Sequence, residues 1–479
     1  MVMHETAISL PVVLPEAVLA LGTLALVLYG ALRGERGSAL INEIAVGLLG
    51  LVFILMVARK RPMGVTFYGS FADDAFTRFM SALTLVGSLV TLLLSIEFMR
   101  KERIGGFEFP VLILISTLGM LMLISANDFI ALYLGFELMS LALYVITAYR
   151  RHDVRATEAG LKYFVLGALS SGMMLYGISL VYGYSGSVAF AAVANAVHDH
   201  ASIAILFGLV FLLVGLAFKI SVVPFHMWTP DVYEGAPTPV TMFFASAPKI
   251  AAMAVLVRVM ITAFPGIDHD WRQILTFVSI ASMVLGAFAA IGQRNFKRLM
   301  AYSSIGHMGY ALVGLAAGTV EGAQSVAIYM AIYVVMTLGT FAAILSMRRA
   351  GRAVETMADL AGLGRTDPTM AFFLAVMMFS LAGVPPLAGF FGKFYVFAAA
   401  IKAGLYGLAV IGVLASCVGA YYYLRIVKLM YFDEPATPFD RPGPVASLVL
   451  ALSGLLIILF VFLPSPITNA AMAAAQSLF

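Results

Sequence analysis

The sequence predicts an all-α integral membrane protein with about fourteen transmembrane helices, a class in which each span needs roughly 20 apolar residues. Hydrophobic residues make up 62% of the 479 residues, and charged residues make up only 11%. The mean hydropathy is +0.99. A soluble domain is roughly half apolar and a quarter charged, so it could not cover so large an apolar core. The loops are short, and we therefore expect residues 1–479 to form a single polytopic membrane domain.

The apolar segments predict the helices in chain order, because each is long enough to cross a bilayer and is bounded by charged residues, Gly or Pro. They cover residues 14–32, 41–58, 74–98, 108–125, 128–149, 158–184, 202–223, 237–263, 273–292, 299–318, 323–347, 369–400, 403–430 and 444–464. Glu5 and Glu16 precede the first apolar run, and no basic residue does. A signal peptide begins with basic residues, so we interpret this segment as a retained helix.

The charged residues alternate from loop to loop. Odd-numbered loops carry Arg33, Arg36, Arg100, Lys101, Arg103, Arg150, Arg151, Arg155, Arg294, Lys297, Arg298, Arg348, Arg349, Arg352 and Arg365. Even-numbered loops carry mainly Asp128, His198, Asp199, His200, Asp268, His269, Asp270 and Glu321, with the exception of Arg59, Lys60 and Arg61. Cytoplasmic loops are enriched in Lys and Arg, so we expect both termini on the opposite side of the membrane. This bias also explains the net charge of +4, and no nucleic-acid partner is predicted.

Two predicted helices are interrupted by proline. The seventh contains Pro224 in GLAFKISVVPFHMWTP, and the twelfth contains Pro385 and Pro386 in FSLAGVPPLAGFFGKFYVF. Proline removes a backbone donor, and in lipid such a break survives only against protein or trapped water. Broken helices at corresponding positions are typical of a transport site between two repeats. We therefore predict one repeat at about residues 108–263 and a second at about 273–430.

The cysteine content excludes several kinds of redox site. Cys417 is the single cysteine of the chain. It cannot form an internal disulfide, a cysteine-bound iron–sulfur cluster or a cysteine-rich zinc site. The sequence has no GxxxxGK[ST] loop, no HExxH and no nucleophile elbow, and its histidines are too scattered to predict a metal site. Redox chemistry must therefore belong to another polypeptide or to a small ligand.

Four ionisable residues lie deep inside apolar segments. Glu137 lies in the fifth segment, Lys219 in the seventh, Lys249 in the eighth and Lys393 in the twelfth. A charged side chain at the bilayer centre costs about 2.5–3.5 kcal/mol on insertion scales, so a functional role is expected. The alternative for Lys219 and Lys249 is that they extend to the membrane surface, and for Glu137 and Lys393 that they have a purely structural role.

Three further residues extend this set. Lys162 lies one or two turns into the sixth segment, where extension to the surface is the alternative explanation. His226 lies in PFHMW and His307 in RLMAYSSIGHMGYALVG, and each could be a hydrogen-bonded core residue. Around His307 lie side chains outside this set that either order water or only pack: Tyr302, Ser303, Ser304 and Tyr310.

Together these residues predict a proton relay. Burial favours the neutral form of a lysine, whereas a nearby carboxylate favours its charged form. A lysine that gains and loses a glutamate partner can therefore bind and release a proton, and histidine titrates near neutral pH. We predict Glu137 and Lys219 as the switch pair, Lys249 as the central relay and Lys393 as the exit or coupling residue.

Three stretches carry a resemblance to a known family: PFHMWTPDVYEGAPTPVTMFFASAPKIAAM (224–253), RNFKRLMAYSSIGHMGY (294–310) and AGVPPLAGFFGKFYVF (382–397). They resemble the N-subunit family of proton-pumping NADH:quinone oxidoreductase, also called respiratory complex I. This family belongs to the antiporter-like group with the L and M subunits and the Mrp-type antiporters. The form DVYEGAPTPVT favours the N subunits.

The resemblance implies inverted repeats of five helices each, with broken helices seven and twelve. It implies relay roles for Glu137, Lys219, Lys249, Lys393, Lys162, His226 and His307. It also implies a bacterial inner membrane location, and the loop charges then predict both termini in the periplasm. NADH, FMN, iron–sulfur clusters and quinone are expected on partner subunits, with no cofactor in this chain. The expected partners are M-type and small K- and J-type subunits of the complex and the lipid bilayer.

Two alternatives stay open. The chain could be a stand-alone cation/proton antiporter of the Mrp type, which would work without NADH-driven electron flow. It could also be a membrane scaffold in which the buried charges only specify packing.

Overall fold

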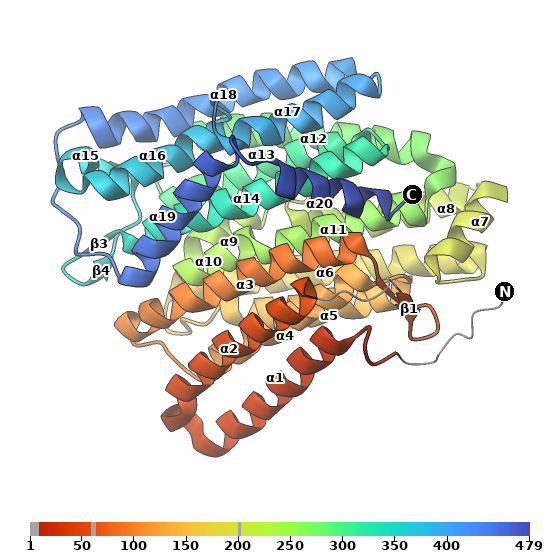
Figure 1. The fold of residues 1–479 in the computed structure, drawn as a ribbon, viewed down its shortest axis with the longest axis horizontal. Coiled ribbons are helices and arrows are strands. Elements are labelled where there is room, and N and C mark those ends of the chain that lie inside the picture. The colour runs from red at the N-terminus through yellow and green to blue at the C-terminus, as the bar shows by residue number, and fades with distance from the viewer. Residues whose placement is uncertain (1–8, 59–63, 200–202) are drawn as a thin grey trace.

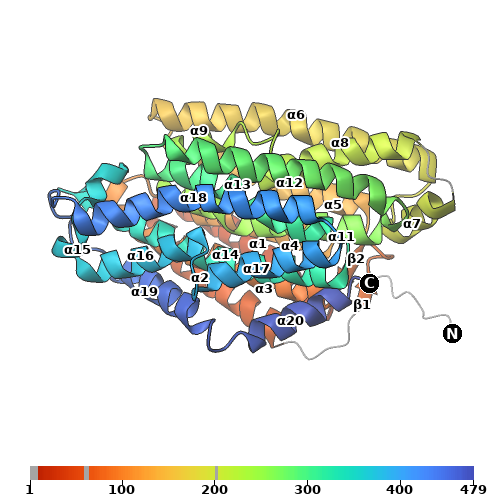
Figure 2. The same cartoon turned by 90° about the horizontal axis from the view of Figure 1, so that it is seen from above.

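The computed structural model describes residues 9–58, 64–199 and 203–479, which form a bundle of helices (Figures 1 and 2). In chain order the helices are α1 (Leu14–Arg33), α2 (Ser38–Val57), α3 (Ala75–Glu102), α4 (Glu108–Ser125), α5 (Phe129–Thr147), α6 (Val154–Ser185), α7 (Phe190–Asp199), α8 (Ile203–Ile220), α9 (Thr229–Gly235), α10 (Thr238–Ala245), α11 (Ala247–Thr262), α12 (Asp268–Ile291), α13 (Phe296–Ala316), α14 (Val320–Ser346), α15 (Leu363–Thr366), α16 (Pro368–Ala382), α17 (Ala388–Lys402), α18 (Tyr406–Phe432), α19 (Pro444–Leu459) and α20 (Ser465–Gln476). The predicted all-α class is confirmed.

Many of these helices begin at a side chain that accepts a hydrogen bond from the first turn. Asp128 at the start of α5 accepts from the amide of Ala131, and Asn295 at the start of α13 accepts from Arg298. Such caps satisfy amide groups that have no partner inside the helix. Short loops and polar caps therefore let the long apolar segments begin and end within a few residues of the predicted boundaries.

Ten stretches of the described residues are long and apolar enough to cross a membrane. One of them, Leu14–Val57, contains both α1 and α2, and α16 and α19 are apolar but shorter. Every predicted segment coincides with one or more helices. Helix α13 contains Lys297 and Arg298 and is not among the ten, so the number of fourteen transmembrane helices stays a prediction.

Two short antiparallel hairpins, which the sequence did not predict, lie at opposite ends of the bundle. Strand β1 (Gly64–Thr66) pairs with β2 (Phe71–Asp73), and β3 (Arg348–Arg349) pairs with β4 (Arg352–Ala353). In Figure 1, β1 lies at the end that holds α7 and the C-terminus, whereas β3, β4 and α15 lie at the other end. This arrangement agrees with the division into odd and even loops. The residues of the charge pattern that lie outside the described ranges are Glu5, Arg59, Lys60, Arg61 and His200.

Both predicted helix breaks are present, and their backbones are alike. Helix α8 ends at Ile220 and is followed by Ser221 at φ 64°, and α16 ends at Ala382 and is followed by Gly383 at φ 86°. The amide of Val222 donates to the carbonyl of Ala217, and the amide of Val384 donates to that of Phe379. These are the bonds of a Schellman ending, in which a left-handed residue stops the helix. The last carbonyls of each half-helix are left for side chains to satisfy.

The eighth predicted helix differs from the prediction, because it is divided at Ser246 into α10 and α11. Pro248 stands at the start of α11, and a proline ring displaces the preceding helical turn. Helices α7 and α20 were also not predicted. They are short and rich in alanine, so they lack the long apolar run on which the prediction relied.

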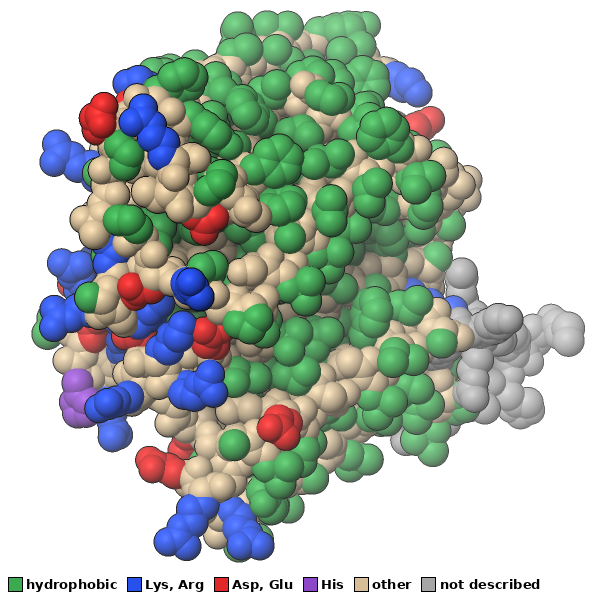
Figure 3. Space-filling view, turned by 60° about the vertical axis from the view of Figure 1, so that its left-hand side comes forward, with side chains coloured by type: hydrophobic (Ala, Val, Ile, Leu, Met, Phe, Trp, Pro, Cys, Tyr) green, Lys and Arg blue, Asp and Glu red, His purple; other side chains and the backbone are tan. Residues whose placement is uncertain are grey.

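The most deeply buried part of the bundle is its centre. In the most apolar part of the stretch Thr238–Thr262, which contains α10 and α11, every residue is buried, whereas in that of Leu14–Val57 only 28% of the residues are. Figure 3 shows a flank covered by hydrophobic side chains, while Lys and Arg gather with Asp and Glu at the end where β3 and β4 lie. An apolar flank between polar ends suits a protein whose sides contact lipid.

Candidate functional site

Lys219 lies near the end of α8 inside a cage of aromatic rings. Its side chain is 2% exposed, and its Nζ donates to Ser140 Oγ at 2.8 Å and to the Tyr163 hydroxyl at 3.0 Å. The rings of Phe136, Tyr144 and Tyr163 lie 5.2–5.7 Å from the nitrogen. Aromatic faces stabilise a cation without fixing it as a carboxylate would. This surrounding therefore accommodates the ammonium without an ionic partner.

Glu137 lies on α5 one turn before Ser140. Its carboxylate accepts a hydrogen bond from Ser171 on α6, and Ser171 Oγ also lies 3.2 Å from the Tyr133 hydroxyl. Glu137 and Lys219 are both described, and no ion pair within 4.0 Å joins them in this structure. The structure therefore brings the two predicted partners to one helix face but holds them apart, and the predicted switch pair stays a prediction.

Lys249 on α11 is bound to the end of the first broken helix. Its Nζ donates to the carbonyl of Ile220, the last residue of α8, at 3.0 Å, and lies 6.0 Å from the centre of the Tyr233 ring. The side chain is 1% exposed. The C-terminal end of a helix carries partial negative charge, so it attracts a cation. Lys249 thus satisfies a carbonyl that the break leaves without a backbone partner.

Lys393 on α17 plays the same part at the second break. Its Nζ donates to the carbonyls of Leu381 and Ala382 at 3.2 and 2.9 Å and to Ser416 Oγ on α18 at 2.8 Å. Gly383 allows this approach, because a Cβ there would lie 2.9 Å from the Cδ of Lys393. Each of the two breaks therefore has a buried lysine at its free carbonyls.

His307 on α13 lies in a cluster of tyrosines. Its Nδ1 is 2.7 Å from the Tyr329 hydroxyl, and its Nε2 is 3.1 Å from the Tyr423 hydroxyl. A cavity of about 10 Å³ is lined by His307, Lys393 and Tyr423, among other residues. That volume is close to the lower limit of about 10–15 Å³ that one water requires. His307 and Lys393 therefore line the same small cavity, and both ring nitrogens of His307 lie within hydrogen-bond distance of tyrosine hydroxyls.

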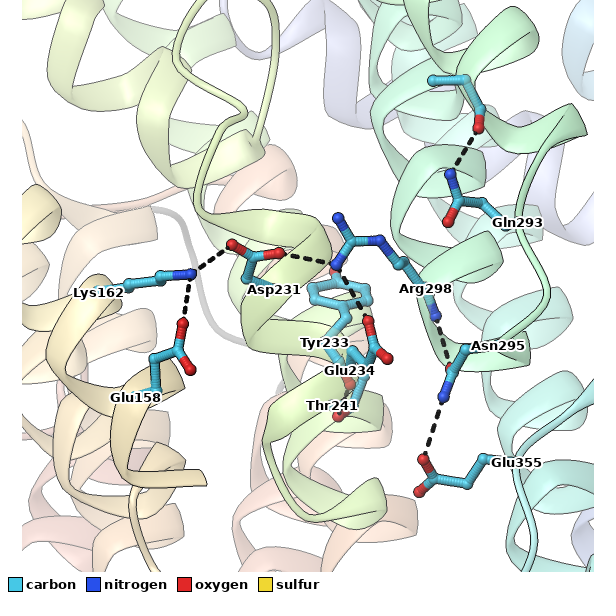
Figure 4. Close-up of polar contacts among 11 residues, drawn as sticks. Glu158, Lys162, Asp231, Tyr233, Glu234, Thr241, Gln293, Asn295, Arg298 and Glu355 are labelled. Atoms are coloured by element: carbon cyan, nitrogen blue, oxygen red, sulfur yellow. Dashed lines mark hydrogen bonds and ion pairs between the residues drawn. The ribbon is translucent and has the colours of Figure 1, made fainter. Parts of the chain in front are cut away.

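Lys162 belongs to a different environment, an ion-pair network near the polar end of the bundle (Figure 4). Its Nζ lies 2.7 Å from Glu158 and 2.8 Å from Asp231, and Arg298 contacts Asp231 and Glu234 at 2.7 and 3.0 Å. Burial raises the pKa of Asp231, but hydrogen bonds and charge from Lys162 and Arg298 outweigh it, so the pKa lies below its usual value. Lys162 is thus paired at the surface, apart from the buried lysines.

His226 lies half-buried in the turn between α8 and α9. No hydrogen bond or ion pair found between the described side chains joins it to Lys219, Lys249 or Lys393. The structure therefore brings Lys249 and Lys219 to the first break and His307 and Lys393 to the second, while His226 lies in the turn that follows the first break.

The sequence prediction missed most of the hydroxyl groups that bind these residues. They are Ser140, Tyr163, Ser171, Tyr329, Ser416 and Tyr423. Serine and tyrosine are common in apolar helices, and each of these partners lies on another segment. No pattern in the sequence distinguishes them from residues that only pack. Within the described ranges, no group of three or more His, Cys, Asp or Glu is arranged to hold a metal ion.

The fold, the paired breaks and the buried lysines define an antiporter-like polytopic membrane protein. The family described as NADH:quinone oxidoreductase/Mrp antiporter, TM, matches residues 126–419. A chain of the Mrp complex from Dietzia sp. DQ12-45-1b has the same fold, with a TM-score of 0.86, 22% identity and 98% coverage of each chain. This second likeness concerns the fold alone.

More similar proteins define a narrower group. The NADH-quinone oxidoreductase subunit N of Beijerinckia indica is 65% identical over 474 residues, which cover 98% of this chain and 99% of the relative. A chain of respiratory complex I from Thermus thermophilus is 36% identical, with a TM-score of 0.84 and coverage of 96% and 99%. The chain belongs to the family of NADH-quinone oxidoreductase N subunits.

Proposed function

We propose that Glu137, Lys219, Lys249, His307 and Lys393 carry protons through this chain. The chain is a membrane-arm subunit of a proton-translocating NADH:quinone oxidoreductase of the bacterial type, and it acts together with other subunits of that complex. The observation that carries the residue assignment is that three lysines are buried between helices, and none of them forms an ion pair with a described carboxylate.

The helix breaks give this arrangement a way to respond to a proton. A charged Lys249 holds the carbonyl end of α8, and a charged Lys393 holds that of α16. Loss of the proton weakens these contacts, because a neutral amine is a poorer donor than an ammonium. Protonation of each lysine is therefore coupled to the geometry of a break. At Lys219, the corresponding response to a change of protonation would be a movement of its side chain from Ser140 toward Glu137.

The two breaks also support the division into inverted five-helix repeats, at about residues 108–263 and 273–430. Each contains a half-helix with a left-handed ending and a lysine at its free carbonyls. A substrate path between two such repeats is a recurrent design in transporters. Lys162 and His226 are assigned secondary roles, since one is paired at the surface and the other lies in the turn.

The remaining assignments follow from the family. We place the chain in the bacterial inner membrane with both termini in the periplasm, on the basis of the loop charges. M-type and small K- and J-type subunits are the proposed neighbours. NADH, FMN, iron–sulfur clusters and quinone are assigned to partner subunits, which the single cysteine of this chain supports.

The test is alanine substitution of Lys219 and of Lys393 in the intact complex, with Lys402→Ala as control. Lys402 is an exposed lysine on α17, the helix that carries Lys393. NADH-driven proton uptake by inverted membrane vesicles is expected to fall by about tenfold or more, as for loss of a positioned proton-transfer group. NADH oxidation by ferricyanide, which measures the amount of assembled complex, is expected to be unchanged. Loss of assembly with normal proton uptake per assembled complex would instead support the scaffold.

The antiporter alternative requires a separate measurement. Purified chain in sealed vesicles, without NADH or partner subunits, is expected to exchange no sodium or potassium ions for protons. Exchange that is abolished by Lys219→Ala would support the antiporter.

A further inference from the structure

A cavity lies where α3, α14 and α19 meet, at the polar end of the bundle. It has a volume of about 30 Å³ and is lined by Lys101, Arg348 and Arg441, together with Glu97 and the apolar side chains of Leu94 and Phe98. Three basic side chains and one acidic side chain line it, and Arg348 is also paired with Glu102, so the excess positive charge is that of Arg441. Glu97 is engaged by Lys101 at 2.7 Å. A cavity needs a volume of about 10–15 Å³ to hold one water, so this cavity has room for a small anionic group.

Arg348 supplies an independent indication of a ligand. Its side chain is nine-tenths buried, and one nitrogen, Nη2, donates to Glu102 at 2.6 Å and to the carbonyl of Gly351. The other nitrogen, Nη1, is buried without a hydrogen-bond partner among the described residues. A buried guanidinium donor without an acceptor is costly, and such groups in native proteins call for a partner. An anionic oxygen in the cavity would provide one.

A second cavity lies beside the first and shares Ser346 and Pro442 with it. It has a volume of about 190 Å³. Its lining includes the apolar side chains of Met370, Phe373 and Leu450 and the polar side chains of Asp367, Thr369 and Ser447. Its apolar side chains lie on helices of the membrane-embedded bundle. A basic pocket at a membrane surface beside a cavity with an apolar wall matches an amphiphile with an anionic head and a hydrocarbon tail.

We propose that these two cavities form a binding site for an anionic phospholipid, with the phosphate at Arg348, Arg441 and Lys101 and an acyl chain beside Phe373 and Leu450. The site lies at the end where basic residues gather (Figure 3), so it faces the leaflet on the side of the odd loops. A bound lipid would join the ends of α3, α14 and α19. This inference does not depend on the proton relay.

The experiment uses the intact complex, purified in mild detergent, and a photoactivatable phosphatidylglycerol. The variants are Lys101→Gln and Arg441→Gln, which avoid the internal contacts of Arg348. The control is Arg352→Gln, an exposed basic residue on β4 at the same end of the bundle. We expect labelling of the peptide with residues 441–451 to fall about fivefold for each basic residue removed, and the control to label as the parent does. Equal labelling of parent and variants would overturn the proposal.

Two further arms separate the possible ligands. Photoactivatable phosphatidylcholine, which carries no net charge, is expected to label this peptide weakly. Equal labelling by both lipids would show an apolar groove without anion recognition and would contradict the proposal. Inorganic phosphate at millimolar concentration is expected not to displace the lipid label. Displacement would identify a site for the free anion and would also overturn the lipid assignment.

Discussion

Helix α11 carries two buried cations with opposite surroundings. Arg258 is 3% exposed and forms two hydrogen bonds to Asp74 at 2.8 and 2.9 Å and a third to Thr77 at 2.8 Å. Lys249, on the same helix, has only a backbone carbonyl and an aromatic ring as polar neighbours. A buried charge is normally paired, because desolvation alone is costly. The difference distinguishes a cation that an ion pair fixes in place from one without a carboxylate partner among the described residues, as the proposed proton transfer at Lys249 requires.

The largest expected effect is on stability, from Arg258→Met. This variant leaves Asp74 uncompensated, which for a buried ion pair costs about 3–5 kcal/mol. We expect little assembled complex in membranes, measured by native gel and by ferricyanide reduction. The double variant Arg258→Met with Asp74→Asn removes both charges and keeps a residue able to cap α3. It should restore most of the assembled complex. Failure to do so would show that the unpaired charge of Asp74 is not the cause of the loss.

The same pair predicts a dependence of stability on pH. Burial raises the pKa of Asp74, but the charge and hydrogen bonds of Arg258, with those of Thr77, outweigh it and lower the pKa below its usual value of about 3.9. Because the folded-state pKa is depressed, the stabilisation is present above the unfolded value and is lost as pH falls through the folded value. The denaturation temperature of the complex should therefore decrease when the pH is lowered below about 4. The Arg258→Met/Asp74→Asn double variant should show a smaller fall over that range.

Lys249→Met should give the opposite result to Arg258→Met, with normal assembly and a loss of about tenfold or more in NADH-driven proton uptake. Methionine has a similar length and leaves no unpaired carboxylate, because Lys249 has none in contact. Lys249→Arg tests proton release more directly. Arginine keeps the cation at the Ile220 carbonyl but does not release its proton. Normal proton uptake by this variant would rule out proton release at residue 249.

Tyr423→Phe should have a smaller effect. The hydroxyl of Tyr423 lies 3.1 Å from His307 Nε2 and also contacts Ser303, so its removal leaves the ring in place but takes away one partner of the histidine. Loss of one buried hydrogen bond corresponds to about three- to tenfold in coupled turnover. Tyr421→Phe, which changes an exposed tyrosine on the same helix, serves as the control. Equal losses in the two variants would indicate general packing rather than a role of the His307 contact.

The sequence predicted the helices and the deep residues because both depend on local composition. Long apolar runs, the prolines at 224 and 385–386 and the lysines beside them are visible without any tertiary information. The break at Ser246 was missed, because a proline in the first turn of a helix, such as Pro248, is indistinguishable in sequence from one inside it. The pairing of Arg258 with Asp74 was also missed. Its partners are 184 residues apart, and no periodic pattern connects them.

Substitution of Asp231 has the smallest predicted effect. It tests the comparison between paired and unpaired cations at an ion-pair network on the surface. It joins Lys162 and Arg298, but its side chain is 36% exposed, and exposed ion pairs contribute only about 0–1 kcal/mol. Asp231→Asn should shift the denaturation temperature by less than about 2 °C and leave proton uptake nearly unchanged. Glu158→Gln, which removes the other carboxylate paired with Lys162, should have an equally small effect on both measurements. A loss of proton uptake specific to Asp231→Asn, with assembly intact, would mean that this network belongs to the proton path and that an ion pair does not exclude a lysine from it.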